Sequence, residues 1–330
     1  METKKLFTPH LYRPEGRQRG EFHHGEENSI WGLAALQHCL GLASGKPSIA
    51  MDDFLASRYS QNSGTYDDVV FVSLDIEGSF HTIREIGIST LDTRDLRDLK
   101  CDPSVLISTH NYRIWTDEKA EMQRPFRFGT SKRLEKRWMG WLIEKCMKTG
   151  SPELTKTEPR TTVLVGHNLR SDFEVLGRTK RGGRFIIQKF PDQLILDTAF
   201  LKGQEYRGPR MTRTQSLKDT CTEFGIECTK SALHCAGNDA NLTMKALMII
   251  AAQSCADEEL DVRQQDRRDF LETVARQPLP RCPYRDVRLE LIDDEELLAS
   301  PRADPSGDWS ENCDGVLGLP DSIEDTMLYR

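Results

Sequence analysis

The hydrophobic and polar positions divide the chain into three parts. Residues 1–66 are mostly polar, and only Ser29–Ala43 has apolar residues at helical spacing, which predicts an N-terminal extension with one short helix. Residues 67–253 contain regular apolar patterns and are expected to form one folded domain. Residues 254–330 are rich in charge and poor in apolar side chains, which indicates a largely disordered acidic tail. We expect truncation beyond about Leu291 to leave folding unaffected.

Within the central part, five short apolar segments have the composition of β-strands, and four others have helical periodicity. The expected strands are Val69–Leu74, Arg84–Thr90, a third that starts at Val105–Ser108, Thr162–Gly166 and Leu194–Leu196. The expected helices are Ser131–Lys148, a segment containing Asp172–Leu176, Ser216–Phe224 and Ala236–Ala252. This order of elements predicts an α/β fold in which a mixed five-stranded sheet is flanked by α-helices.

Composition and charge narrow the function classes. No apolar run reaches the ~18 residues of a membrane span, and the first residues lack the apolar core of a secretion signal, so we expect an intracellular protein, cytoplasmic and/or nuclear. The nine cysteines contain no Cys-x-x-Cys pair, which argues against a zinc ribbon and indicates free thiols. Of the net charge of −7, residues 254–330 carry 20 acidic and 9 basic side chains. The remainder, with 36 basic and 32 acidic residues, is mildly basic and therefore compatible with nucleic acid without requiring it.

Two acidic residues end the first predicted strand, in the sequence Asp75-Ile76-Glu77. Residues two apart on a strand face the same side, so both carboxylates converge on one point. Like charges that close are costly unless a cation lies between them, and carboxylate oxygens suit Mg²⁺ or Mn²⁺. Two solvent-exposed acids at a strand end, with no metal, would give the same sequence pattern, so this motif alone does not identify a metal site.

Two further motifs contribute acids later in the chain. Asp172 lies about one turn into the helix that follows the strand ending at Gly166, although an acid there also suits the helix dipole. His234 lies in a loop five residues before Asp239, which opens the last predicted helix. A neutral imidazole in that place could accept a proton from a bound water near neutral pH. The alternative is that Asp239 only caps the helix and that His234 has no role in catalysis.

The order of these motifs resembles the DEDDh 3′→5′ exonuclease family over about Val69–Ala252. The segments REIGIST and SLKDTCTEFGI are typical of the family, and HCAGNDA with FRFGTS is similar to a fungal branch that includes the "good for full DEAD" proteins and the exonuclease domain of quelling-interacting protein. The resemblance implies an RNase H-like fold with two divalent metal ions, Mg²⁺ or Mn²⁺. It implies four metal ligands, Asp75, Glu77, Asp172 and Asp239, with His234 as general base. Many members have Thr where this chain has Gly78, and loss of that hydroxyl is expected to weaken the hold on a 3′ end.

The implied substrate is single-stranded nucleic acid, with RNA favoured by the fungal branch. Phe80 and His81 follow the first motif and are placed to touch a terminal nucleotide. Positive charge for the strand's backbone is offered by Arg207–Arg213 and by an earlier segment containing Arg178, Lys180, Arg181 and Arg184. Solvated charged loops explain both basic segments equally well.

Two other functions fit the same sequence. One is a catalytically weak or inactive nuclease-fold protein that binds RNA or acts as a scaffold in mRNA export or RNA silencing, because a fold does not guarantee activity. The other is a metal-dependent hydrolase of small nucleotides, which a deep closed pocket would favour and an open basic groove would oppose. The sequence identifies no protein partner.

Overall fold

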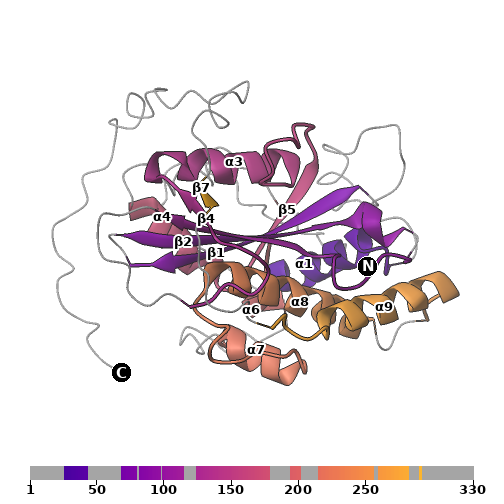
Figure 1. Ribbon diagram of the computed structural model, residues 1–330. Helices are drawn as coiled ribbons and strands as arrows, with labels where there is room; N and C mark the ends of the chain where they lie inside the picture. The colour runs from indigo at the N-terminus through magenta and orange to yellow at the C-terminus, as the bar shows by residue number, and fades with distance from the viewer. Residues whose placement is uncertain are drawn as a thin grey trace, which may run out of the picture.

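The computed structural model describes residues 26–43, 68–79, 82–97, 99–114, 124–178, 194–201, 215–255, 259–281 and 290–291. A single mixed sheet lies between two layers of helices (Figure 1). Among these residues, no helix is both long enough and apolar enough to span a bilayer. The seven cysteines in the described ranges are all free thiols.

The sheet has the strand order β6-β5-β1-β2-β3-β4-β7 in the described residues. Its strands are β1 (Val69–Gly78), β2 (Ile83–Asp92), β3 (Ser108–Ile114), β4 (Lys132–Leu134), β5 (Thr161–Gly166), β6 (Leu194–Asp197) and β7 (Glu290–Leu291). β2 pairs antiparallel with β1 and β3, whereas the other neighbours are parallel. The α/β, RNase H-like class expected from the sequence is confirmed, and all five predicted strands are present. The sequence missed two short strands at the sheet edge, β4 and β7, because neither is long enough to show alternation.

The described residues contain seven α-helices and two 3₁₀ turns, η1 (Thr93–Leu96) between β2 and β3 and η2 (Lys136–Trp138) between β4 and the next helix. The helices are α1 (Glu26–Cys39), α3 (Met139–Thr149), α4 (Leu169–Arg178), α6 (Thr198–Leu201), α7 (Leu217–Glu223), α8 (Ala236–Ser254) and α9 (Val262–Ala275). α3 and α4 cover one face of the sheet, while α1, α6, α8 and α9 lie on the other (Figure 1).

Alternation along β1 explains the two cores. Val69 and Phe71 pack among residues of α8 and α9, whereas Val70 and Val72 pack among residues of α3 and α4. Since side chains two apart on a strand share a face, a β-branched run such as this one suits a strand covered on both sides. α8 is buried from Ala236 to Ala252, because the sheet covers one of its sides and other helices cover the rest.

Two predicted boundaries were wrong. Val105 is exposed and precedes the third strand, which starts at Ser108. The helix expected over Ser131–Lys148 begins only at Met139, after β4 and η2. Leu134, Trp138 and Leu142 recur at helical spacing, yet they belong to three elements that bury them in one cluster. The apolar spacing therefore reflected a shared core rather than one continuous helix.

Part of the segment expected to be disordered is folded. α9 begins with a capping box at Asp261 and Gln264 and packs Leu271 and Val274 into the core. Arg267 is 6 % exposed and donates to the carbonyl oxygens of Leu40 and Leu96, both at 3.2 Å. The sequence underestimated α9 because its buried positions include polar residues, whose burial depends on these long-range bonds. The tail beyond Leu291 lies outside the described residues, so its dispensability stays a prediction.

We expect Arg267→Ala to destabilise the protein by about 2–4 kcal/mol. The change leaves two buried carbonyl oxygens without their charged donor and opens a cavity beside Gly41. Thermal denaturation of the metal-free protein measures the effect. Arg268→Ala is the matched control, since Arg268 contacts Asp269 at the surface of the same helix. Equal melting temperatures for the two variants would show that α9 does not stabilise the core through Arg267.

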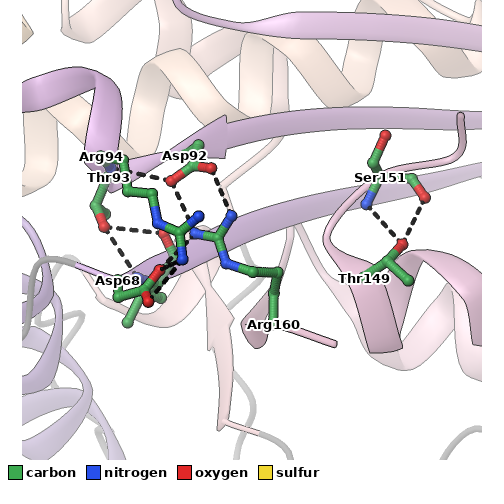
Figure 2. Close-up of polar contacts among 8 residues, drawn as sticks. Asp68, Asp92, Thr93, Arg94, Thr149, Ser151 and Arg160 are labelled. Atoms are coloured by element: carbon green, nitrogen blue, oxygen red, sulfur yellow. Dashed lines mark hydrogen bonds and ion pairs between the residues drawn. The ribbon is translucent and has the colours of Figure 1, made fainter. Parts of the chain in front are cut away.

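A cluster of ion pairs connects the ends of three inner strands, at the point where β1 and β5 begin and β2 ends (Figure 2). The Arg160 guanidinium donates to Asp68 Oδ1 at 2.7 Å and to Asp92 Oδ2 at 2.8 Å, and Arg94 contacts Asp68 at 2.7 Å. Burial by itself would raise the pKa of Asp92, but the bonds from Arg160 and Arg94 hold it below its usual value. The cluster lies at the opposite end of β1 from Asp75 and so stabilises the sheet away from the candidate site.

Candidate metal centre

Asp75 and Glu77 lie on the α8 side of β1, continuing the face that begins with Val69 and Phe71. Asp75 pairs across the strands with Gly87 of β2. A Cβ atom at Gly87 would lie 1.8 Å from the Ala236 carbonyl oxygen, so the first turn of α8 rests directly on the backbone of β2. Gly87 therefore lets the start of α8 approach the strand pair that carries Asp75.

Two hydrogen bonds donated by its backbone amides fix the first turn of α8, which carries Asp239. Ala236 N donates to Glu85 Oε2 at 3.2 Å, and Gly237 N donates to Asn111 Oδ1 at 2.9 Å. A Cβ atom at Gly237 would lie 2.6 Å from the Phe126 ring, so glycine is required there too. Orphan amides at a helix start need acceptors, and here β2 and β3 supply them.

Asp172 reaches the same place from the other layer of helices. Asp197, at the end of β6, accepts bonds from Asn168 N at 2.8 Å and Leu169 N at 2.9 Å and thereby anchors the start of α4. Asp172 then accepts a bond from Ile76 N at 3.2 Å, between the two acids of β1. His167 is not available for catalysis, because its two ring nitrogens contact Thr198 Oγ1 and Gln215 O, both at 2.9 Å.

His234 borders the acids from an exposed loop. Its backbone has φ of 62°, in the left-handed region, and its amide donates to Asp239 Oδ2 at 2.8 Å. Its Nδ1 lies 3.6 Å from Glu77 Oε1, and its side chain is 75 % exposed. One potential ligand atom from each of Glu77, His234 and Asp239 lies within 4.8 Å of the others.

Burial and mutual repulsion raise the pKa values of the acids at this point. For Asp75, burial is the largest contribution and the carboxylates of Asp239 and Asp172 add to it, so its pKa lies well above the usual value. Burial also raises the pKa of Asp172, against the bond from Ile76 N. The pKa of Asp239 rises to about 8, chiefly through burial, with Glu77 adding to the effect and the His234 amide opposing it.

The arrangement fits a bound cation. Asp239 Oδ1 is buried and has no hydrogen-bond partner in the described part of the chain. An unpaired carboxylate oxygen among further acids is costly unless it is protonated or a cation neutralises it. An all-oxygen donor set suits a hard divalent ion such as Mg²⁺ or Mn²⁺. Asp75, Glu77, Asp172 and Asp239 are the residues that could hold such ions.

The structure explains why a glycine occupies position 78. The register between β1 and β2 shifts at Glu77 and Gly78, and Ser79 N bonds to Thr82 O at 2.9 Å just beyond. A Cβ atom at Gly78 would lie 2.4 Å from the Thr82 carbonyl oxygen, so a threonine there would require the backbone to move. The departure from the family pattern is therefore part of this hairpin's geometry.

The nucleic-acid contacts expected from the sequence fall almost entirely outside the described residues. Phe80, His81, Lys180, Arg181, Arg184 and Arg207–Arg213 lie outside the described residues. Arg178 is the last residue of α4, but its side chain lies outside the described part as well.

Two charged residues near the centre were not predicted. Glu85 is 3 % exposed, faces Arg113 at 3.3 Å, and pairs across the strands with Glu77. Arg84 Nη2 lies 4.0 Å from Glu77 Oε2. Both lie in the segment REIGIST, where their closeness to Glu77 could have been found only by aligning the two strands in their hairpin register.

The fold and the clustered acids together define a DEDDh exonuclease domain. The chain belongs to that family. The family model described as "DNA polymerase III subunit epsilon-like, C-terminal domain" matches residues 70–250, more than half of the chain. No curated protein matches the chain well enough to serve as a named relative. Family membership points to nuclease activity on nucleic acid, for which DEDDh proteins use divalent metal ions.

Proposed function

We propose that the protein is a metal-dependent 3′→5′ exonuclease that hydrolyses single-stranded nucleic acid, with RNA as the preferred substrate. The observation that carries this proposal is that acids from α4 and α8 both lie close enough to Asp75 of β1 to repel its charge, while the Oδ1 of Asp239 in α8 is buried without a described partner. The preference for RNA rests on the similarity of HCAGNDA and FRFGTS to the fungal branch that includes the "good for full DEAD" and quelling-interacting proteins. RNA would be met in the cytoplasm or the nucleus, the compartments expected from the sequence.

The four acids and His234 divide the chemistry between them. Asp75, Glu77, Asp172 and Asp239 would hold two divalent ions, Mg²⁺ or Mn²⁺. Such ions lower the pKa of a water and neutralise charge on the departing 3′ oxygen. His234 would accept the proton of the attacking water. Its ring is exposed to solvent, and its Nδ1 lies 3.6 Å from Glu77 Oε1, so it borders the proposed metal ligands.

The test compares degradation of 3′-labelled and 5′-labelled single strands of RNA and DNA. Each strand is incubated with Mg²⁺, with Mn²⁺ or with EDTA. We expect the 3′ label to be released first as a mononucleotide, only with metal, and faster from RNA. Release of the 5′ label first would overturn the direction, and equal rates on RNA and DNA would overturn the preference.

A scaffold function is favoured by one observation, the exclusion of a side chain at Gly78. A protein of that kind would bind the labelled RNA without degrading it under any metal condition. Hydrolysis of free nucleotides but not of strands would instead identify a small-nucleotide hydrolase.

A further inference from the structure

The loop that carries His234 is held by a residue distant in sequence, Arg127. Its Nη2 donates to Ser231 Oγ at 2.9 Å and to Thr229 Oγ1 at 3.5 Å. The two hydroxyls also contact each other at 3.0 Å. The amides of Ala232 and Leu233 bond back to Thr229 O, so fixing Thr229 fixes the turn that leads into His234.

The backbone of Arg127 is tied to the first turn of α8 by Asn238. Asn238 is fully buried and accepts a bond from Arg127 N at 3.0 Å. It donates to Pro125 O at 3.0 Å and to Ala232 O at 2.8 Å. One amide side chain thus joins the Arg127 segment, the His234 loop and the helix that carries Asp239.

Residues 277–280 follow α9, and we call them the strap. The guanidinium of Arg127, which contacts the His234 loop through Nη2, also contacts the strap. Arg127 Nη1 donates to Pro280 O at 3.2 Å. The strap is itself fastened, since Lys245 Nζ donates to Gln277 O at 2.7 Å and Leu279 N donates to Glu227 Oε2 at 3.1 Å. Its sequence, Gln-Pro-Leu-Pro, contains two prolines whose fixed φ angles limit backbone freedom. The strap lies beyond residues 70–250, which the family model matches.

His234 needs support of this kind from its loop. Its side chain is 75 % exposed, so packing does not fix the ring. Its left-handed backbone costs on the order of 1 kcal/mol for a residue with a Cβ atom. Such a conformation persists only where the surroundings determine it. The placement of the ring therefore depends on the contacts that hold residues 229–233.

We propose that Arg127 is a positioning residue for His234, linking the strap to the loop. This inference rests on the proposed function, in which His234 accepts the proton of the attacking water. Arg127 touches none of the acids in any described contact. It acts on the loop of the proton acceptor, which meets the metal ligands through the bond from the His234 amide to Asp239 Oδ2. The strap is then a part of the catalytic structure that lies outside the family-matched region.

The experiment measures hydrolysis by Arg127→Ala in the wild-type and His234→Ala backgrounds of the full chain. We expect Arg127→Ala to lower kcat roughly 10- to 100-fold with little change in KM, because a misplaced proton acceptor slows the chemical step. In the His234→Ala background the same change is expected to alter kcat by less than about 2-fold, since two residues acting through one group are not additive. A similar fall in both backgrounds would overturn the proposal.

Hydrogen exchange provides a readout that does not need activity. The amides of Ala232, Leu233 and His234 are expected to exchange faster in Arg127→Ala than in wild type. Arg276→Ala is the matched control, because Arg276 adjoins the strap but pairs with Glu272 of its own helix. Unchanged exchange in Arg127→Ala would overturn the proposal even if kcat falls.

Two further measurements distinguish failure of this inference from misfolding of the variant and from failure of the proposed function. If Arg127→Ala does not fold, Ser231→Ala removes the shorter of the two contacts of Arg127 with the loop, together with the contact between Ser231 and Thr229. It is expected to change kcat and exchange in the same direction, to a smaller extent. If it changes neither, the proposal is wrong. If wild-type protein hydrolyses no strand, the proposed function fails, and the positioning role falls with it, while exchange still decides whether Arg127 holds the loop.

Discussion

Asp239→Asn is expected to abolish metal-dependent hydrolysis and at the same time to make the metal-free protein more stable. The substitution removes a charged ligand whose Oδ1 has no other described partner, so metal affinity and rate should fall together, the rate by at least about 10³-fold. It also removes a buried negative charge that burial and Glu77 both disfavour. The melting temperature with EDTA should therefore rise by a few degrees.

The pH dependence has a defined sign. The pKa of Asp239 is raised to about 8 in the folded protein, against about 4 in the unfolded chain, so the folded state binds more protons between these values. The stability of the metal-free wild type should fall as pH rises from about 4 to about 8. The fall should be smaller in Asp239→Asn.

Calorimetry of metal binding and thermal melts at several pH values check both expectations. Asp266→Asn, at an exposed acid of α9, is the control for loss of one negative charge. Added Mn²⁺ should raise the melting temperature of wild type and of this control but not of Asp239→Asn. A metal-dependent rise of equal size in Asp239→Asn would rule out its role as ligand.

His234→Ala is expected to separate rate from metal binding. Hydrolysis should fall by about 10²–10⁴-fold, the usual contribution of a positioned general base. Metal affinity should stay within a few-fold of wild type, because the four acids supply the oxygen ligands and His234 is mostly exposed. Added imidazole should restore part of the rate if the missing group is a proton acceptor.

The decisive measurement is rate against Mn²⁺ concentration for wild type, His234→Ala and Asp239→Asn. His234→Ala should keep the half-saturating metal concentration and lose rate, whereas Asp239→Asn should lose both. If His234→Ala hydrolyses as fast as wild type, another group accepts the proton. If it binds metal far more weakly, His234 is a ligand and not a base.

Local patterns in the sequence were sufficient to predict where the acids lie on their elements. Alternation put Asp75 and Glu77 on one face of a strand, and the glycine that ends β5 indicated that Asp172 lies about one turn into the following helix. The prediction that these acids bind metal ions together came from the family resemblance. Their catalytic roles stay a prediction until the variants above are measured.

Contacts between distant parts of the chain were not predictable in this way. Glu85 is buried because Arg113 and the start of α8 meet it, and neither partner is evident from its neighbours in sequence. The burial of Arg267 in α9 likewise depends on the carbonyl oxygens of Leu40 and Leu96, which lie 227 and 171 positions away in the sequence. Composition alone made α9 resemble a disordered segment, because polar residues that find long-range partners look the same as polar residues that face water.

The position of α8 late in the chain has a consequence for biosynthesis. β1, β2 and β3 leave the ribosome well before Ala236–Ser254, yet Val69, Phe71 and Leu91 are buried on the face that α8 covers. Because only α1 precedes the sheet on this face, the part that α8 covers stays exposed until α8 is synthesised, and α9 then packs against α8. The core on this side therefore cannot be completed before the C-terminal helices are made, and transiently exposed apolar surface of this kind is prone to aggregation.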